Sequence, residues 1–325
     1  MQLTRRQFLA HSATATALTA AGCASVKPSA EPLIVDTHQH LWDLTTQQLP
    51  WLGGAPEILR HSFRTEEYRA ATAGLNVRAI YMEVDVADAG LVAEAEFVLG
   101  LAAGGQTPTR AAVIGGRPDA PDFGAYLKRF QASPHFKGVR RVLHSPATPA
   151  GYCLQPGFVR GVQLLGEAGK SFDLCMRAPE LMDAVRLTEL CPNTRFILDH
   201  CGNPDLKCFR APRPGEDRPR HTADSWKSSI DAFARCPNVI GKISGIAASL
   251  TPGGGAEDLA PVVNHCLDAF GPDRVVFGGD WPVCLLGATY QQWVTMLRQI
   301  IASRPAEHQR KLWSANALSH YAIKA

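Results

Sequence analysis

Short runs of β-branched and other apolar residues recur along the chain, and amphipathic segments with a helical period separate them. The runs are bounded by Gly, Pro, Asn or charged residues, as is typical of strands. Eight runs fit this description, at residues 33–37, 78–84, 110–114, 138–143, 172–176, 195–198, 239–243 and 274–277. Their alternation with helical segments predicts a parallel sheet, because parallel neighbours need a crossover connection.

The helical segments begin at Thr, Asp or Pro in several cases and end at Gly or Pro, which are helix-boundary residues. They include residues 65–73, 89–103, 158–168, 178–190, 225–235 and 259–270. Eight βα repeats predict an α/β protein with a (β/α)8 TIM-like barrel, formed as a single domain over residues 33–325. A doubly wound sheet fits less well, because the first strand-to-helix turn, His38-Gln39-His40-Leu41-Trp42, lacks the glycine fingerprint of that fold.

Long connections follow the strands, notably at residues 146–156 and 203–224, whereas the connections before strands are short. Long loops on the C-terminal face of a barrel usually shape a substrate pocket. The second loop carries more basic than acidic residues: Lys207, Arg210, Arg213, Arg218 and Arg220 against Glu216 and Asp217. It is predicted to be either a solvated charged loop or a cationic lip that attracts an acidic substrate.

The N-terminal residues do not follow the barrel pattern. Thr4-Arg5-Arg6-Gln7-Phe8-Leu9 precedes a weakly apolar Ala/Thr-rich stretch, which predicts a twin-arginine export signal over residues 1–22. Cys23 follows Ala-Ala-Gly, as at a lipoprotein processing site, and residues 23–32 are predicted to form a tether. We therefore expect a periplasmic protein, or a lipoprotein anchored to the membrane through a lipidated Cys23.

Charge and cysteine content narrow the possible partners. The formal net charge is only +3 and no basic stripe is present, so nucleic acid is not expected as a partner. The nine cysteines show no Cys-x-x-Cys pair and no zinc-finger spacing, and most are expected to be buried thiols. Export would permit a disulfide between Cys191 and Cys236, which each precede Pro-Asn ahead of a strand.

Metal-ligand residue types stand at the ends of three predicted strands. His38 and His40 end the first strand with an i, i+2 spacing that places both imidazoles on one face. His200 ends the strand at 195–198, and Asp280 follows the strand at 274–277. In a (β/α)8 barrel the C-terminal strand ends form the active-site face, so these four residues are expected to converge there.

Other strand ends offer substrate-binding groups. Arg140 and His144 share strand parity, and a guanidinium inside a barrel is costly unless it meets an anion or several acceptors. Arg140 is therefore predicted to bind substrate or its reacting carbonyl. Glu83, Asp85 and Lys242 either point into the barrel mouth or form an internal ion-pair network.

Two tryptophans flank the expected site. Trp42 follows the first-strand histidines, and Trp281 follows Asp280. An indole ring can stack on a sugar-like ring, although core packing is the usual role of tryptophan. Both are predicted as substrate-binding residues, with core packing as the alternative.

Several motifs in the same order resemble the amidohydrolase superfamily, and within it the amidohydrolase-related lactonases. They are residues 36–43 (DTHQHLWD), 138–141 (GVRR), 172–177 (FDLCMR), 198–204 (LDHCGNP), 242–245 (KISG) and 277–282 (FGGDWP). The resemblance extends from about Ile34 to the C-terminus. It implies that His38, His40, His200 and Asp280 hold one divalent metal, zinc in preference, and that Asp280 handles the proton of the attacking water. Asp280, His200 and Arg140 are then the catalytic residues.

One position departs from the resembled pattern. Many metal-dependent members carry a histidine at the end of the fifth strand, where this chain has Cys175-Met176-Arg177. This departure argues against the deaminase and decarboxylase branches. Some of the resembled lactonases are described as working without metal, with histidines and arginines that polarise the carbonyl.

The resemblance implies an enzyme that opens a sugar-acid lactone with water. A hydrolase of another ester or amide is one alternative. A catalytically silent barrel, tethered through Cys23 and used for binding, is another, although the presence of Asp280 and both first-strand histidines weighs against it. The sequence makes no prediction of oligomeric state.

Overall fold

A computed structural model describes residues 31–212 and 215–324 of the chain. The residues from Leu33 onward form one compact unit. The predicted export signal, Cys23 and most of the predicted tether lie outside the described residues. No helix within the described ranges is long and apolar enough to cross a membrane.

Eight parallel strands form one sheet in the order of the sequence, from β1 to β8. They are β1 (Ile34–Gln39), β2 (Val77–Met82), β3 (Thr109–Gly115), β4 (Phe136–Val142), β5 (Ser171–Cys175), β6 (Arg195–Leu198), β7 (Val239–Ile243) and β8 (Val275–Phe277). Every neighbouring pair is parallel. The predicted (β/α)8 barrel is therefore confirmed, and each predicted strand overlaps an observed one.

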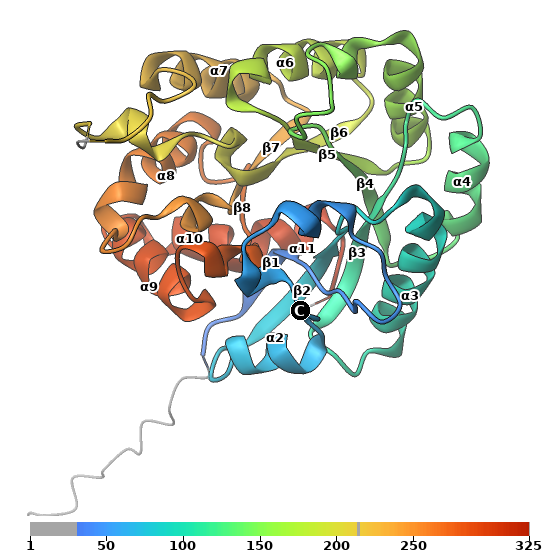
Figure 1. Cartoon of the computed structure of the whole chain (residues 1–325), viewed down its shortest axis with the longest axis horizontal. Coiled ribbons are helices and arrows are strands. Elements are labelled where there is room, and N and C mark those ends of the chain that lie inside the picture. Colours follow the sequence, from blue (N-terminus) through green and yellow to red (C-terminus); the bar gives the residue numbers. More distant parts are fainter. Residues whose placement is uncertain (1–30, 213–214, 325) are drawn as a thin grey trace, which may run out of the picture. The chain divides into compact units, whose positions relative to one another are not determined.

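Helices surround the ring of strands (Figure 1). They are α2 (Thr65–Ala71), α3 (Leu91–Gly104), α4 (Phe123–Phe130), α5 (Pro156–Glu167), α6 (Leu181–Leu190), α7 (Ala223–Arg235), α8 (Ala256–Phe270), α9 (Tyr290–Ile301), α10 (Ala306–Arg310) and α11 (Asn316–His320). The sequence interpretation named six of these and did not name α4 or the last three. The longer helices, such as α3, α8 and α9, supply apolar residues that pack into the core around the sheet.

A small apolar cluster fills the barrel interior below the site. It contains Val35, Ile80, Val113, Ile197 and Val276, which are all at most 1% exposed, and Tyr321, just beyond α11, packs against it. A second and larger cluster lies between the strands and the surrounding helices. We call the end of the barrel at the C-terminal ends of the strands its upper end. Because apolar side chains fill the lower barrel, the polar residues of the strand ends lie at this upper end.

The barrel closes between β1 and β8 through a few polar contacts. The amide of His40 donates to the carbonyl of Trp281, and the amide of Asp280 donates to the carbonyl of His38, each at 2.9 Å. The buried Asp36 carboxylate accepts from the amides of His38 and Gly279 at 2.9 and 2.7 Å. Asp36 therefore ties the first strand to the last beside both predicted site residues.

The register of β1 shifts between Asp36 and Gln39. Strict alternation would place Asp36 and His38 on one face of the strand. Instead Asp36 accepts from the Tyr68 hydroxyl of α2 at 2.8 Å, whereas His38 lies beside Lys242 of β7. The irregularity lets one carboxylate close the barrel while the next histidine enters the site.

We expect Gly161→Ala in α5 to destabilise the barrel by about 1–3 kcal/mol, because overpacking forces backbone shifts. A Cβ atom at Gly161 would lie 2.0 Å from the carbonyl oxygen of Pro118. Chemical denaturation of the purified variant measures the change in unfolding free energy.

Gly100→Ala in α3 is the matched control, because no atom lies within 4 Å of its Cβ position. This variant should be unchanged or more stable by roughly 0.5–1 kcal/mol, as expected for alanine in a helix. Equal effects of the two substitutions would contradict the packing of α5 described here.

Candidate active site

Two buried cations lie inside the upper barrel, and each is held by carboxylates. Arg140 of β4 donates from Nε to Glu83 Oε1 at 2.6 Å and from Nη2 to the Glu83 carbonyl at 2.7 Å. Lys242 Nζ of β7 lies 2.8 Å from Asp173 Oδ2 and 2.7 Å from Asp199 Oδ1. Charges removed from water need such partners, so these pairs fix the side chains in place.

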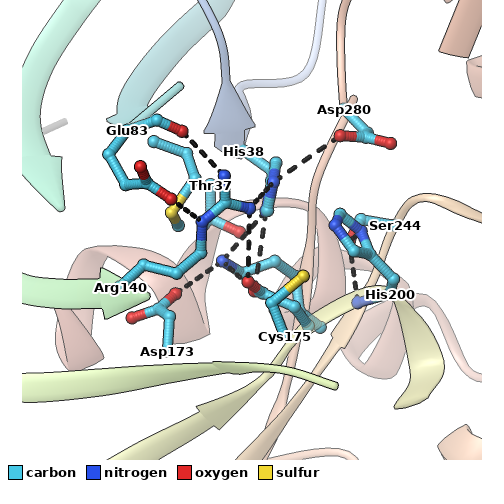
Figure 2. Close-up of polar contacts among 12 residues, drawn as sticks. Thr37, His38, Glu83, Arg140, Asp173, Cys175, His200, Ser244 and Asp280 are labelled. Carbon is cyan, nitrogen blue, oxygen red and sulfur yellow. Dashed lines mark hydrogen bonds and ion pairs between the residues drawn. The ribbon is translucent and has the colours of Figure 1, made fainter. Parts of the chain in front are cut away.

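His38 lies beside Arg140 (Figure 2) and also contacts Lys242. Its Nε2 is 3.2 Å from Arg140 Nη1, and its Nδ1 is 3.3 Å from Lys242 Nζ. Burial, followed by the charge of Lys242, holds the pKa of His38 well below its usual value. The imidazole is therefore neutral at physiological pH and can act as an acceptor or a metal ligand.

His40 has a defined tautomer. Its Nδ1 lies 2.9 Å from the carbonyl oxygen of Met82, which can only accept, so Nδ1 carries the proton. Nε2 then faces Asp280 Oδ1 at 3.4 Å. A histidine whose outer nitrogen donates to a carbonyl is typical of metal ligands.

His200 and Asp280 both have left-handed backbone conformations, with φ values of 55° and 53°. His200 Nδ1 lies 3.0 Å from Ser244 Oγ, which orients its ring (Figure 2). Burial lowers the pKa of His200, so this ring is also held neutral. Gly245 packs against His200, and a Cβ there would lie 2.3 Å from Nδ1.

The four residues predicted at the strand ends lie together. The His38 ring lies 4.9 Å from the His40 ring and 4.4 Å from the His200 ring, measured between centroids. Asp280 Oδ1 is 3.6 Å from His38 Nε2. The His38 and His200 imidazoles and the Asp280 carboxylate thus converge at the upper end of the barrel, and His40 contacts the same carboxylate.

A cavity of about 420 Å³ opens above this point. Its polar lining includes His40, Asp85, Arg140, His144, Asn203, Ser249 and Asp280, and its apolar lining includes Trp51, Val84, Val142 and Val283. A cavity of this size suits a small ligand. Arg140 and His144 both lie at its wall, and their substrate-binding role stays a prediction.

Trp42 and Trp281 do not line this cavity, which corrects their predicted role. Trp42 is 1% exposed, donates from Nε1 to the His61 carbonyl at 2.6 Å, and packs edge-on against Trp51. Trp281 is 2% exposed and packs against Phe63. Both belong to the apolar core, because the chain turns outward after each strand end.

Trp51 is the tryptophan that lines the cavity, and the sequence interpretation missed it. It lies in the loop after β1, and its Nε1 donates to the Val84 carbonyl at 2.8 Å. Its pattern in the sequence, Leu-Pro-Trp-Leu, does not distinguish it from a core residue. Only the path of the loop brings it to the site.

The long loop from Asn203 shows internal ion pairing rather than a free cationic lip. Arg210 pairs with Glu216, and Lys207 lies 3.4 Å from Asp205. The loop lines a neighbouring cavity of about 730 Å³ that shares His144 with the catalytic cavity. The described part of the loop therefore supports the solvated-loop alternative.

Cys175 takes the place of the fifth-strand histidine of the resembled pattern. Its Sγ lies 3.2 Å from His144 Nδ1 at the cavity wall. Burial raises the pKa of Cys175 to about 12, so the group is a neutral thiol. Burial also lowers the pKa of His144 to about 4, so the pair carries no charge at neutral pH.

The disulfide that export would permit between Cys191 and Cys236 is not formed. All described cysteines are free thiols. Cys191 Sγ lies 3.7 Å from the Val159 carbonyl, and Cys236 Sγ lies 3.5 Å from the Ala232 carbonyl in its own helix. Equivalent sequence positions before two strands did not bring the thiols together.

The donor set fits a divalent cation. Ligand atoms of His38, His200 and Asp280 all lie within 4.8 Å of one another, and His40 Nε2 faces the same carboxylate. Imidazole nitrogen and carboxylate oxygen are ligands of zinc and related divalent ions.

The charge around the histidines also fits such an ion. Four buried carboxylates face two buried cations: Glu83, Asp173, Asp199 and Asp280 against Arg140 and Lys242. Burial raises the pKa of Asp173 to about 6, which leaves it ionised above neutral pH. Carboxylates therefore outnumber cations around the histidines, which favours the binding of a divalent cation.

The amidohydrolase family profile matches residues 35–323, nearly the whole barrel. The chain therefore belongs to the amidohydrolase family and is a hydrolytic enzyme. The L-fucono-1,5-lactonase of Burkholderia multivorans is 27% identical to it over 299 residues, covering 90% of this chain and 96% of that protein. The L-fucono-1,5-lactonase of Burkholderia ambifaria is 24% identical, covering 82% and 87%.

Solved structures share the barrel. An amidohydrolase from Burkholderia multivorans with bound zinc has a TM-score of 0.78 and 26% identity, over 90% of this chain and 100% of that chain. A putative 2-pyrone-4,6-dicarboxylic acid hydrolase from Pseudomonas putida has a TM-score of 0.67 and 17% identity, covering 90% and 98%. The second likeness shows the fold alone.

Glu94 of α3 is a buried carboxyl group behind Glu83. Its Oε1 accepts from the Tyr81 hydroxyl and the Val84 amide, both at 2.8 Å. Its Oε2 has no hydrogen-bond partner in the described part of the protein. Burial, followed by the charge of Glu83, raises the pKa of Glu94 to about 8.

We expect Glu94→Gln to become more stabilising, relative to the natural chain, as the pH rises from about 5 to 8. The unfolded chain ionises Glu94 near the ordinary pKa of 4.5, whereas the fold keeps it protonated up to about 8. The stability that protonated Glu94 contributes is therefore present at low pH and is lost through this window. Glutamine does not titrate and removes the loss.

Thermal unfolding of both proteins between pH 5 and 8.5 measures this difference. Glu96→Gln on the exposed side of α3 is the control and should show no such trend. A constant difference in melting temperature between Glu94→Gln and the natural chain would contradict a protonated Glu94.

Proposed function

We propose that this protein hydrolyses a sugar-acid lactone to the open-chain hydroxy acid. The observation that carries the proposal is the Asp280 carboxylate at the cavity floor, 3.4 Å from His40 Nε2 and 3.6 Å from His38 Nε2. A base beside imidazoles and a guanidinium is the arrangement that ester hydrolysis needs. The lactonase names of two relatives supply the substrate class.

Asp280 acts as the general base in this proposal. Its Oδ1 takes the proton of a water molecule as the water oxygen attacks the lactone carbonyl. The resulting tetrahedral intermediate carries a negative charge on the former carbonyl oxygen. Protonated Asp280 then returns the proton to the ring oxygen as the bond between this oxygen and the carbonyl carbon breaks.

Arg140 and His200 stabilise the developing charge. Glu83 occupies Nε and Nη2 of Arg140, which leaves Nη1 directed toward His38 and the reaction point. A guanidinium that is already fixed costs no reorganisation during the reaction. His144 lies higher on the cavity wall, where a neutral imidazole can bind substrate hydroxyls.

A divalent ion, zinc in this proposal, would be held by His38, His40, His200 and Asp280, and it would acidify the attacking water and polarise the carbonyl. Support comes from the donor set and from the zinc in the Burkholderia multivorans amidohydrolase structure. We further propose that the protein is exported through residues 1–22 and tethered through Cys23, on the sequence pattern alone.

We expect Asp280→Asn to keep the fold and to lower turnover by ~10²–10⁴-fold, as is typical for loss of a general base. The amide keeps the shape of the side chain but does not accept the proton. The measurement is acid release from a panel of aldonolactones, followed with a pH indicator, together with thermal unfolding. Asp268→Asn, in an exposed ion pair with Arg304, is the control. If Asp280→Asn turned over lactones as fast as the natural chain, the general base would lie elsewhere.

We expect elemental analysis of the purified protein to find about one divalent ion per chain, as in four-ligand zinc sites. His200→Ala should lower this content, whereas His265→Ala should not, because His265 pairs with Asp231 away from the site. Metal-free protein with full activity would leave the histidines as hydrogen-bonding groups only.

A further inference from the structure

Asp85 stands out among the groups that line the catalytic cavity. It follows β2 with a left-handed φ of 49°, which is uncommon for a residue other than glycine. Its amide donates to Glu83 Oε2 at 2.6 Å, so the ion pair below it fixes its backbone. Its side chain is 34% exposed, and Asp85 lines the cavity.

The Asp85 carboxylate has no close partner in the described protein. Its one ionic contact is Arg117 Nη2 at 3.7 Å, and this arginine is bound more closely by Asp88, at 2.8 Å. Burial, followed by the charge of Glu83, raises the pKa of Asp85. A half-buried carboxylate without donors is a group whose hydrogen bonds must come from water or from a ligand.

An aromatic face lies beside this carboxylate. Trp51 lines the same cavity and donates its indole N–H to the carbonyl of Val84, the residue before Asp85. Because its polar atom is already used, Trp51 offers the ligand only its ring. A ring face next to a free acceptor matches a compact molecule with apolar C–H edges and hydroxyl groups.

The charges of the cavity disfavour an acidic ligand. Arg140 is the only arginine or lysine among the described lining residues, and Glu83 occupies two of its nitrogens. The pKa of His144 is lowered to about 4, chiefly by burial, so this ring adds no charge at neutral pH. Asp85 is acidic, and a ligand carboxylate placed beside it would meet like charge.

We propose that Asp85 is the specificity-determining residue of the site: it accepts hydrogen bonds from hydroxyls of a neutral polyhydroxylated lactone, and Trp51 packs on the lactone ring. The inference rests on the proposed lactonase function and adds to it the group that selects hydroxylated, uncharged substrates. A site built to bind a hydroxyl rejects analogues that lack it, because its polar group is left unpaired.

Asp85→Gly is the test variant, because glycine adopts the left-handed backbone without strain while the carboxylate is removed. Three substrates are compared by acid release: a neutral hexonolactone, δ-valerolactone without hydroxyls, and an aldaric acid monolactone with a free carboxylate. We expect kcat/KM for the hexonolactone to fall ~10- to 100-fold, mainly through KM, as for loss of a hydrogen bond to a charged group. The value for δ-valerolactone should stay within about twofold.

The ratio of kcat/KM for the neutral hexonolactone to kcat/KM for the acidic lactone should fall in Asp85→Gly. It should also fall in Asp85→Asn, which keeps the side-chain shape without the charge. Asp268→Asn is the matched control, since Asp268 is exposed and its ion pair with Arg304 lies outside this cavity. It should leave selectivity unchanged. An equal loss for all three lactones in Asp85→Gly would assign Asp85 a structural role and overturn the proposal.

Binding of 1,5-anhydroglucitol, a cyclic polyol without a carbonyl, separates this proposal from the proposed reaction. Calorimetry should show weaker binding to Asp85→Gly than to the natural chain, even if no lactone is hydrolysed. Equal binding to both proteins, or no binding to the natural chain, would overturn the role of Asp85. Failure of lactone hydrolysis with the expected binding difference would overturn only the reaction.

Discussion

The burial of charge inside the upper barrel is the constraint on which the site depends. Arg140 and Lys242 are removed from water, and an unpaired charge there would be very unfavourable. Their carboxylate partners lie on other strands or directly after them, so the pairs form only when β2, β4, β5, β6 and β7 are in register. His38 contacts both cations, and burial, followed by the charge of Lys242, lowers its pKa and keeps it neutral. The geometry of the reaction point is therefore a consequence of charge pairing beneath it.

The barrel and the four strand-end residues could be predicted because both follow local rules. Alternating strand and helix patterns define the fold, and the strand ends of a barrel must converge, so His38, His200 and Asp280 meet wherever the loops go. The predicted substrate-binding role of Trp42 was wrong, because the direction of a side chain beyond a strand end depends on the path of the loop. Trp51 was missed for the same reason.

Backbone conformation accounts for much of what the sequence does not show. Asp85, His200 and Asp280 have φ values of 49°, 55° and 53°. For residues with a Cβ this region costs ~1–2 kcal/mol each, so the surrounding contacts must hold them there. A left-handed residue breaks the alternation of side-chain direction, so strand parity does not predict where its side chain points. All three are at the cavity wall, where a strained backbone is most often found.

The contacts that close the barrel between β1 and β8 also hold His38 and Asp280 in position for catalysis. β1 and β8 meet through an isolated bridge between Gln39 and Trp281 and through the Asp36 carboxylate, rather than through a continuous ladder. His38 and Asp280 lie on opposite sides of this seam. A small separation there would move the base away from the imidazole while the helices and the remaining strands stay packed. The protein would then be inactive well before it is unfolded, and its working temperature range would be set by the seam and not by the core.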